Sequence, residues 1–348
     1  MAVDGIFKGR KKNKTMIVSK LSKYKTNLNT AYKLMRALFF KTRIPFIVQL
    51  VLTYRCNRKC KYCAIWDKDC KELSTGQILL LIAQMADMGT RRIYFSGGET
   101  LLRDDIGLIL EYCRQKGIRT VLNSNGSLVP ERIKELYSLG VLCLSLDGPR
   151  QVHDSIRGLN SYNEVMDAIR LSRENKIKVG LKTVLSSMNL KHIDFILDKA
   201  KEFKTTVVFQ PATLSVLGGN NPNPLVPIIK EYRSTIKTLI KEKRTNKYIG
   251  NSYSALRYFY QWPAPTPIYC VSGLIVCHIS PDGRLSGCGR RLFDCENNSS
   301  NCLQVGFREA FLKSPRYSCK ECWCSGYLEL NCLASLKLDA IFNIINLA

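Results

Sequence analysis

Short apolar runs alternate with amphipathic segments along residues 46–212 of this chain. Runs rich in β-branched and aromatic residues predict six strands, at 46–53, 91–97, 118–124, 141–147, 178–185 and 206–212. Apolar residues at three- and four-residue spacing predict helices between them, at 74–88, 103–116, 130–139, 161–175 and 189–203. Strands and helices that alternate in this way form a parallel sheet with right-handed crossovers. We therefore expect an α/β fold with a partial (β/α)6 TIM-type barrel, because the pattern shows no seventh or eighth unit.

Composition divides the chain into further segments. The expected parts are a basic N-terminal extension, the barrel core, a connector, a small cysteine-rich domain and a C-terminal helix, at 1–44, 45–212, 213–268, 269–335 and 336–348. The cysteine-rich domain is expected to hold a β-hairpin, because Pro281-Asp282-Gly283 follows a short apolar run.

The N-terminal extension carries much of the net charge of +25, with twelve Lys or Arg against the single acid Asp4. Its apolar residues have rough helical periodicity, which fits either a helix packed on its own domain or one at an anionic membrane surface. No apolar run reaches the length that spans a bilayer, and no secretory signal precedes the 15 cysteines. We expect a protein of the reducing cytoplasm, at most peripheral to the inner membrane surface.

Polar motifs follow the first four predicted strands. They are a cysteine loop, Ser96-Gly97-Gly98-Glu99, Asn123-Ser124-Asn125-Gly126 and Ser145-Leu146-Asp147-Gly148. In barrels of parallel strands, chemistry gathers at the carboxyl ends, so these motifs are expected at one mouth.

The cysteine loop places Cys56, Cys60 and Cys63 in a C-x3-C-x2-C spacing. Three thiolates can hold three irons of a [4Fe-4S] cluster and leave the fourth iron open, as an open position distinguishes catalytic metal sites. By spacing alone, half of a zinc site or a redox pair remains an alternative.

Taken together, these motifs resemble those of the radical S-adenosylmethionine (radical SAM) enzymes. That superfamily is similar in its C-x3-C-x-aromatic-C loop, where Tyr62 fills the aromatic place, and in its GGE motif, matched by Gly97, Gly98 and Glu99. Thr100 stands where the family more often has proline. The resemblance implies that Cys56, Cys60 and Cys63 are catalytic and hold a [4Fe-4S] cluster that binds S-adenosylmethionine (SAM). It also implies that SAM is cleaved reductively to a 5′-deoxyadenosyl radical. It also implies a reductant such as ferredoxin or flavodoxin.

The same resemblance suggests residues that bind the cosubstrate. The candidates are Tyr62, Gly97, Gly98, Glu99, Ser124, Asn125, Asp147, Arg157 and Gln210. Glu99 would accept a hydrogen bond from the methionine ammonium, and Arg157 suits a carboxylate. Ser124 and Asn125 also fit a simple turn, and Asp147 and His153 are weaker candidates with a structural alternative.

A second set of cysteines follows the connector. Cys270, Gly283 and Cys288 form C-x12-G-x4-C, and Cys319 and Cys322 form C-x2-C. This resembles the SPASM/twitch-like domain, which implies an auxiliary [4Fe-4S] cluster on the four cysteines, with zinc as the alternative. The later spacing departs from the long SPASM pattern, so a second auxiliary cluster would need other cysteines: Cys277, Cys295, Cys302, Cys324 and Cys332. Cys70, Cys113 and Cys143 fall in a predicted loop, helix and strand and are expected to have no functional role, because cysteine is commonly a small buried residue.

The sequence therefore predicts a radical SAM enzyme that abstracts hydrogen from an unidentified substrate. A peptide or protein, or an anionic lipid or sugar, is favoured. The alternative is a non-catalytic iron-sulfur or zinc protein that binds nucleic acid through its charge. Specific nucleic-acid recognition is not expected, because the basic residues lack interleaved aromatics.

Overall fold

The structure, a computed structural model, describes residues 36–37, 40–289, 299–317 and 319–340. Most of the basic extension, the end of the expected C-terminal helix and Cys295 lie outside these residues. The membrane contact proposed for the extension therefore stays a prediction. Among the described helices, none combines the length and the apolar character that crossing a bilayer requires.

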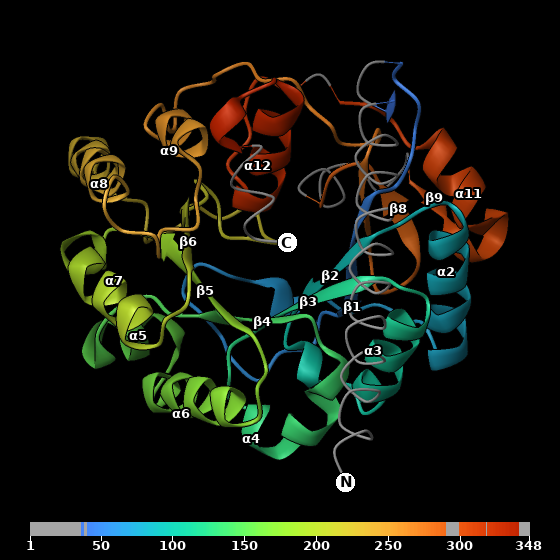
Figure 1. The fold of residues 1–348 in the computed structure, drawn as a ribbon, viewed down its shortest axis with the longest axis horizontal. Helices are drawn as coiled ribbons and strands as arrows, with labels where there is room; N and C mark the ends of the chain where they lie inside the picture. Colours follow the sequence, from blue (N-terminus) through green and yellow to red (C-terminus); the bar gives the residue numbers. More distant parts are fainter. Residues whose placement is uncertain (1–35, 38–39, 290–298, 318, 341–348) are drawn as a thin grey trace, which may run out of the picture.

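Six parallel strands form the centre of the fold (Figure 1). Their order in the sheet is β6-β5-β4-β3-β2-β1, so each lies beside the strand that precedes it in the chain. They are β1 (Ile47–Thr53), β2 (Arg92–Gly97), β3 (Arg119–Ser124), β4 (Val141–Ser145), β5 (Val179–Leu185) and β6 (Val207–Pro211). The predicted α/β fold on a mostly parallel sheet is confirmed.

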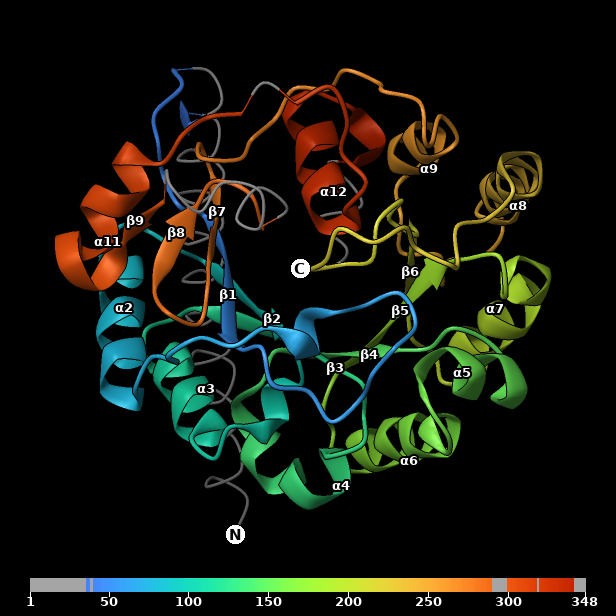
Figure 2. The same cartoon turned by 180° about the vertical axis from the view of Figure 1, so that it is seen from behind.

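Helices follow these strands and surround the curved sheet (Figure 2). They are α2 (Thr75–Asp87), α3 (Ile106–Gln115), α4 (Val129–Arg132) with a 3-10 turn at Ile133–Ser138, α5 (Arg150–Arg157), α6 (Ser161–Glu174) and α7 (Ile193–Glu202). Ser74 begins α2 with a capping box, in which Ser74 and Gln77 each accept the other's backbone N–H. Only α5 was not expected, because its sequence is largely polar.

The second half of the chain adds shorter elements. They are α8 (Ile229–Glu242), α9 (Tyr253–Phe259), β7 (Val276–Ile279), β8 (Arg284–Ser286), β9 (Ser300–Asn301), α11 (Cys302–Lys313) and α12 (Ser325–Ala334). The expected hairpin is present, since β7 and β8 pair antiparallel with His278 opposite Ser286. The pattern did not predict that β7 also pairs parallel with β1, with Ile47 opposite Val276. The hairpin thus continues the barrel sheet.

Helix α12 lies in the space between the two ends of the sheet (Figures 1 and 2). It contacts β6 and α9 on one side, while α11 packs on α2 beyond the other end. The open side of the partial barrel is therefore lined by the cysteine-rich segment.

Candidate active site at the barrel mouth

The cysteine loop leaves β1 and crosses the mouth of the barrel (Figure 2). Cys56, Cys60 and Cys63 are all partly exposed. The loop is anchored by its own backbone, because Lys61 N donates to the carbonyl of Ile156 at 3.0 Å and Cys63 N to that of Cys60 at 2.9 Å. These two backbone hydrogen bonds hold the loop in place.

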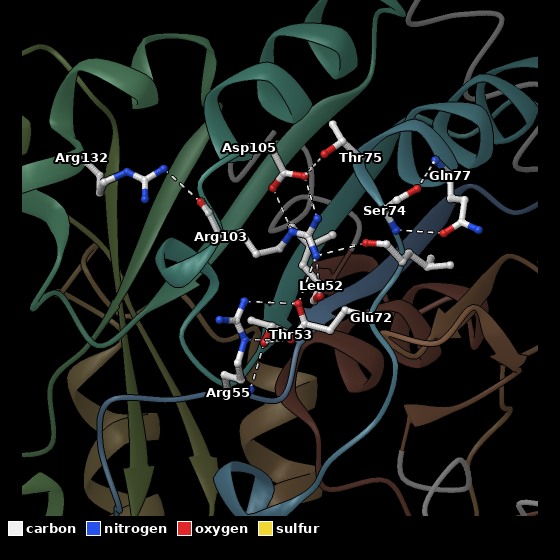
Figure 3. Close-up of polar contacts among 11 residues, drawn as sticks. Leu52, Thr53, Arg55, Glu72, Ser74, Thr75, Gln77, Arg103, Asp105 and Arg132 are labelled. Atoms are coloured by element: carbon white, nitrogen blue, oxygen red, sulfur yellow. Dashed lines mark hydrogen bonds and ion pairs between the residues drawn. The ribbon is translucent and has the colours of Figure 1, made fainter.

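An ionic network holds the start of the loop (Figure 3). The Glu72 carboxylate accepts hydrogen bonds from Thr53 Oγ1 at 2.5 Å and Arg55 Nε at 3.0 Å. Arg103 donates to the same carboxylate at 3.2 Å and pairs with Asp105 at 2.6 Å. Arg103 is only 9% exposed, and through these contacts its guanidinium connects the end of β1 to the segments that lead into α2 and α3.

Two glycines pack directly against the backbone that leads into the cysteines. A Cβ on Gly98 would lie 2.0 Å from the Arg55 carbonyl oxygen and 2.5 Å from that of Tyr54. A Cβ on Gly97 would lie 2.3 Å from the Thr53 oxygen, and Gly97 also has φ of +125°. Both positions therefore require glycine, for close approach and, at Gly97, for its backbone conformation.

Glu99 continues this turn and is 1% exposed. Its Oε1 accepts hydrogen bonds from Leu101 N at 3.2 Å and Ser124 Oγ at 2.9 Å, and its Oε2 accepts one from Asn125 N at 2.8 Å. Asn125 in turn donates to the Asn57 side chain in the cysteine loop at 2.9 Å. Burial raises the pKa of Glu99, while these hydrogen bonds oppose that shift. Glu99, Ser124 and Asn125, predicted separately from two strands, therefore form one cluster.

A buried trio lies behind Cys60. Arg157 Nε pairs with the Asp147 carboxylate at 2.7 Å, and Tyr62 Oη donates to the same carboxylate at 3.0 Å. Arg157 also bonds Tyr62 Oη, and its Nη1 lies 3.9 Å from the Cys60 sulfur. His153 accepts a hydrogen bond from the Asp147 backbone at 3.1 Å. Asp147 is fully buried, so its charge serves as the counter-ion of Arg157.

The loop thiols have raised pKa values. Burial raises the pKa of Cys56 to about 11 and also raises those of Cys60 and Cys63, with Arg157 opposing the shift at Cys60. Metal loading must therefore displace thiol protons. Among the described residues, no three His, Cys, Asp or Glu side chains are close enough to share a single metal ion.

The second set of cysteines gathers on the opposite side of the mouth. Burial raises the pKa of Cys322, and the neighbouring thiols Cys324, Cys288 and Cys270 add to the shift. Cys319 and Cys324 line the same cavity as Cys288 and Cys322. Cys324 thus lies with the predicted four, as a fifth thiol beside them.

A cavity of about 340 Å³ lies between the cysteine loop, through Tyr62 and Ile65, and the second set of cysteines. Its walls include Tyr62 and Gln210 from the barrel and Cys288 and Cys319 from the cysteine-rich segment. Gln210 also accepts a hydrogen bond from Ser325 at 3.3 Å, so it joins β6 to the start of α12. The cavity has the size and the convergent polar groups typical of a small-molecule or peptide side-chain site.

The match to a protein-family model identifies the domain that carries these motifs. Residues 50–200, which carry both the cysteine loop and the Gly97-Gly98-Glu99 turn, match the radical SAM superfamily. The chain therefore contains a radical SAM domain. Such a domain implies a [4Fe-4S] cluster and SAM as cofactors.

Two enzymes of known name are similar to this chain in sequence, and one solved structure is similar to it in fold. The Fe-coproporphyrin III synthase of Methanosarcina barkeri is 36% identical over 48% of this chain, which spans only 43% of that synthase. The PqqA peptide cyclase of Bradyrhizobium diazoefficiens is 25% identical over 70% of this chain and 67% of its own. The crystal structure of Streptococcus suis SuiB bound to SAM superposes with a TM-score of 0.66 at 15% identity, over 84% of this chain and 71% of SuiB, which shows a shared fold.

The residues of this radical SAM domain fit the implied group. Three thiols lie on one short loop, and the Gly97-Gly98 turn packs beneath it with no room for a Cβ. Sequence reasoning missed Arg103 and Glu72, which position the loop, and Lys182, which lines the cavity. A lysine in the middle of a predicted strand that is otherwise mostly apolar was the one available signal for Lys182.

Proposed function

We propose that this chain is a radical SAM enzyme that acts on a substrate in the cavity between the barrel mouth and the second set of cysteines. One observation carries the proposal: the cysteine loop and the Gly97-Gly98-Glu99 turn pack on each other through contacts that only glycine permits. When bound, the cluster supplies the electron that cleaves SAM to methionine and a 5′-deoxyadenosyl radical.

The chain's own residues would bind the cluster and orient SAM. Cys56, Cys60 and Cys63 would each hold one iron. Among the described residues, Glu99 receives three hydrogen bonds, which leaves one carboxylate lone pair for the methionine ammonium. The guanidinium of Arg157 would balance negative charge at Cys60, a supporting role in place of the carboxylate contact expected from the sequence.

Cys270, Cys288, Cys319 and Cys322 would hold an auxiliary [4Fe-4S] cluster on the far wall of the cavity. Cys288, Cys319 and Cys322 line one cavity, and Cys270 is close enough to Cys322 to raise its pKa, which supports this assignment. At that position the cluster could accept an electron from the substrate or help to position it. An acidic reductant such as ferredoxin or flavodoxin would supply electrons to the first cluster.

Two relatives indicate different substrate classes. A peptide is favoured by the PqqA peptide cyclase, which this chain matches over most of its length. A tetrapyrrole is the second candidate, because the higher identity is to the Fe-coproporphyrin III synthase, over about half of this chain.

The decisive experiment is anaerobic reconstitution with iron and sulfide, followed by SAM and dithionite. We expect about eight irons per chain, for two four-iron clusters, and formation of 5′-deoxyadenosine. The Cys60→Ala variant should lose 5′-deoxyadenosine and keep part of its iron, whereas Cys113→Ala, changed inside α3, should keep both. Loss of all iron from Cys60→Ala would show that the assignment of the cysteines to two separate clusters is wrong.

The same assay tests the non-catalytic alternative. Stoichiometric zinc with no SAM cleavage would reject the enzyme and favour a metal-binding protein that uses its charge to bind nucleic acid.

A further inference from the structure

Strand β5 presents one cation to the interior of the barrel. Its burial alternates along the strand, with Val179, Leu181 and Leu185 buried towards the surrounding helices. The residues between them have the opposite orientation, and Lys182 is the charged one. Lys182 therefore lies partway along the interior of the barrel.

Two cavities meet at this lysine. The cavity at the mouth, of about 340 Å³, and a second one deeper in the barrel, of about 350 Å³, both have Lys182 in their walls. They also share Gln49, Cys324 and Tyr327, so the two form adjoining parts of one interior space. A ligand at the mouth can reach Lys182 without leaving the barrel.

The charges around this space are mostly positive. Arg92, Arg119 and Lys178 line the deeper cavity near the starts of their strands. Lys182 lies four residues further along β5, about 13 Å from Lys178 at the rise of an extended strand. Lys320 also lies in the wall of the mouth cavity, but among the described residues Lys182 is the one cation that lines both cavities.

Carboxylates are few here. Glu321 lies in the wall of the mouth cavity and Glu329 in that of the deeper one. Glu329 accepts a hydrogen bond from Ser252 N at 2.8 Å. In the part of the chain that the structure describes, no carboxylate forms an ion pair with Lys182. A half-buried ammonium without a counter-ion attracts an anionic ligand.

We propose that Lys182 binds a carboxylate of the substrate and so positions the substrate within the mouth cavity. This inference rests on the proposed function of the mouth cavity as the substrate site. A single charge matches a monoanion, and the amides of Gln49 and Gln210 in the same cavity offer further hydrogen-bond donors. Apolar Val51, Val184 and the Tyr62 ring would contact the rest of the ligand.

The test uses anthracene-9-carboxylate and its methyl ester, two fluorescent probes that share one ring system. Binding is measured by fluorescence titration of the anaerobically reconstituted full chain, without SAM or dithionite. We expect the acid to bind about tenfold more tightly than the ester. Lys182→Met should abolish that preference, whereas Lys182→Arg, which keeps the charge, should retain most of it.

Lys241→Met, a change on the exposed surface of α8, is the matched control and should leave the preference intact. Iron content and the thermal midpoint establish that each variant is folded. Equal binding of acid and ester, an unchanged preference in Lys182→Met, or no binding of either probe up to about 1 mM would each overturn the inference.

The two proposals fail separately. A chain that prefers the acid through Lys182 but forms no 5′-deoxyadenosine contradicts the enzymatic proposal alone. A chain that forms 5′-deoxyadenosine but shows no preference for the acid contradicts only the role of Lys182.

Discussion

Replacing Gly98 with alanine adds one methyl group where the Gly97-Gly98 turn packs on the backbone of the cysteine loop. That Cβ would lie 2.0 Å from the Arg55 carbonyl oxygen and 2.5 Å from that of Tyr54. Both neighbours are backbone atoms, so no side chain can rotate away. The loop or the turn must move as a unit.

The cost follows from the bonds that such a movement breaks. Gly98 N donates to the Thr53 carbonyl at 3.0 Å, and Glu99 N donates to the Arg55 carbonyl at 2.9 Å. Two lost backbone hydrogen bonds cost about 2 kcal/mol, and the strain of overpacking adds about 1–3 kcal/mol. We expect Gly98→Ala to lower the free energy of unfolding by about 3–5 kcal/mol and to displace Cys56 from its position.

Urea unfolding and iron content after reconstitution measure the two effects. Gly76→Ala is the matched control, because a Cβ there meets no atom within 4 Å and the residue lies in α2. Alanine at Gly76 should stabilise the protein by up to about 1 kcal/mol. If Gly98→Ala unfolds within about 0.5 kcal/mol of the parent and binds the same iron, the assigned packing is wrong.

Two further predictions concern the buried trio and its neighbour His153. Asp147→Asn leaves Arg157 buried without its counter-ion and should lower the free energy of unfolding in urea by about 3–5 kcal/mol. The control Asp167→Asn breaks an exposed ion pair and should lower it by less than about 1 kcal/mol. Equal losses in the two variants would contradict burial of the trio. Burial lowers the pKa of His153 to about 4, below its unfolded value of about 6.5, so the unfolded state binds more protons between these values. Stability should therefore decrease by about 1.4 kcal/mol for each unit by which the pH is lowered from about 6.5 towards 4. His153→Gln should reduce this pH dependence, and an unchanged slope would exclude His153 as its source.

The local parts of the fold were predictable from the sequence because their signals are local. The β-branched runs locate β1 to β6 within two residues at each end, and Ser74 with Gln77 marks the start of α2. The same holds for the cysteine loop and the Gly97-Gly98-Glu99 turn, whose spacing carries the family resemblance.

Long-range relations were not predictable in this way. Tyr62 and Asp147 are 85 residues apart, and Arg157, which bonds both, lies at the end of α5, a helix that its polar sequence conceals. Likewise, a four-residue strand such as β7 carries no signal of its partner, so its place beside β1 emerged only in the structure. The charge balance around Lys182 depends on strands and helices from both halves of the chain.

The pairing of β7 with β1 limits how the protein can be shortened. A truncated protein that ended before Cys270 would lose β7 and leave β1 as a bare edge, with unpaired backbone groups open to other chains. Such a fragment should self-associate even though all six parallel strands are intact. Design of a minimal catalytic core must therefore keep the hairpin, or replace it with another strand that protects this edge.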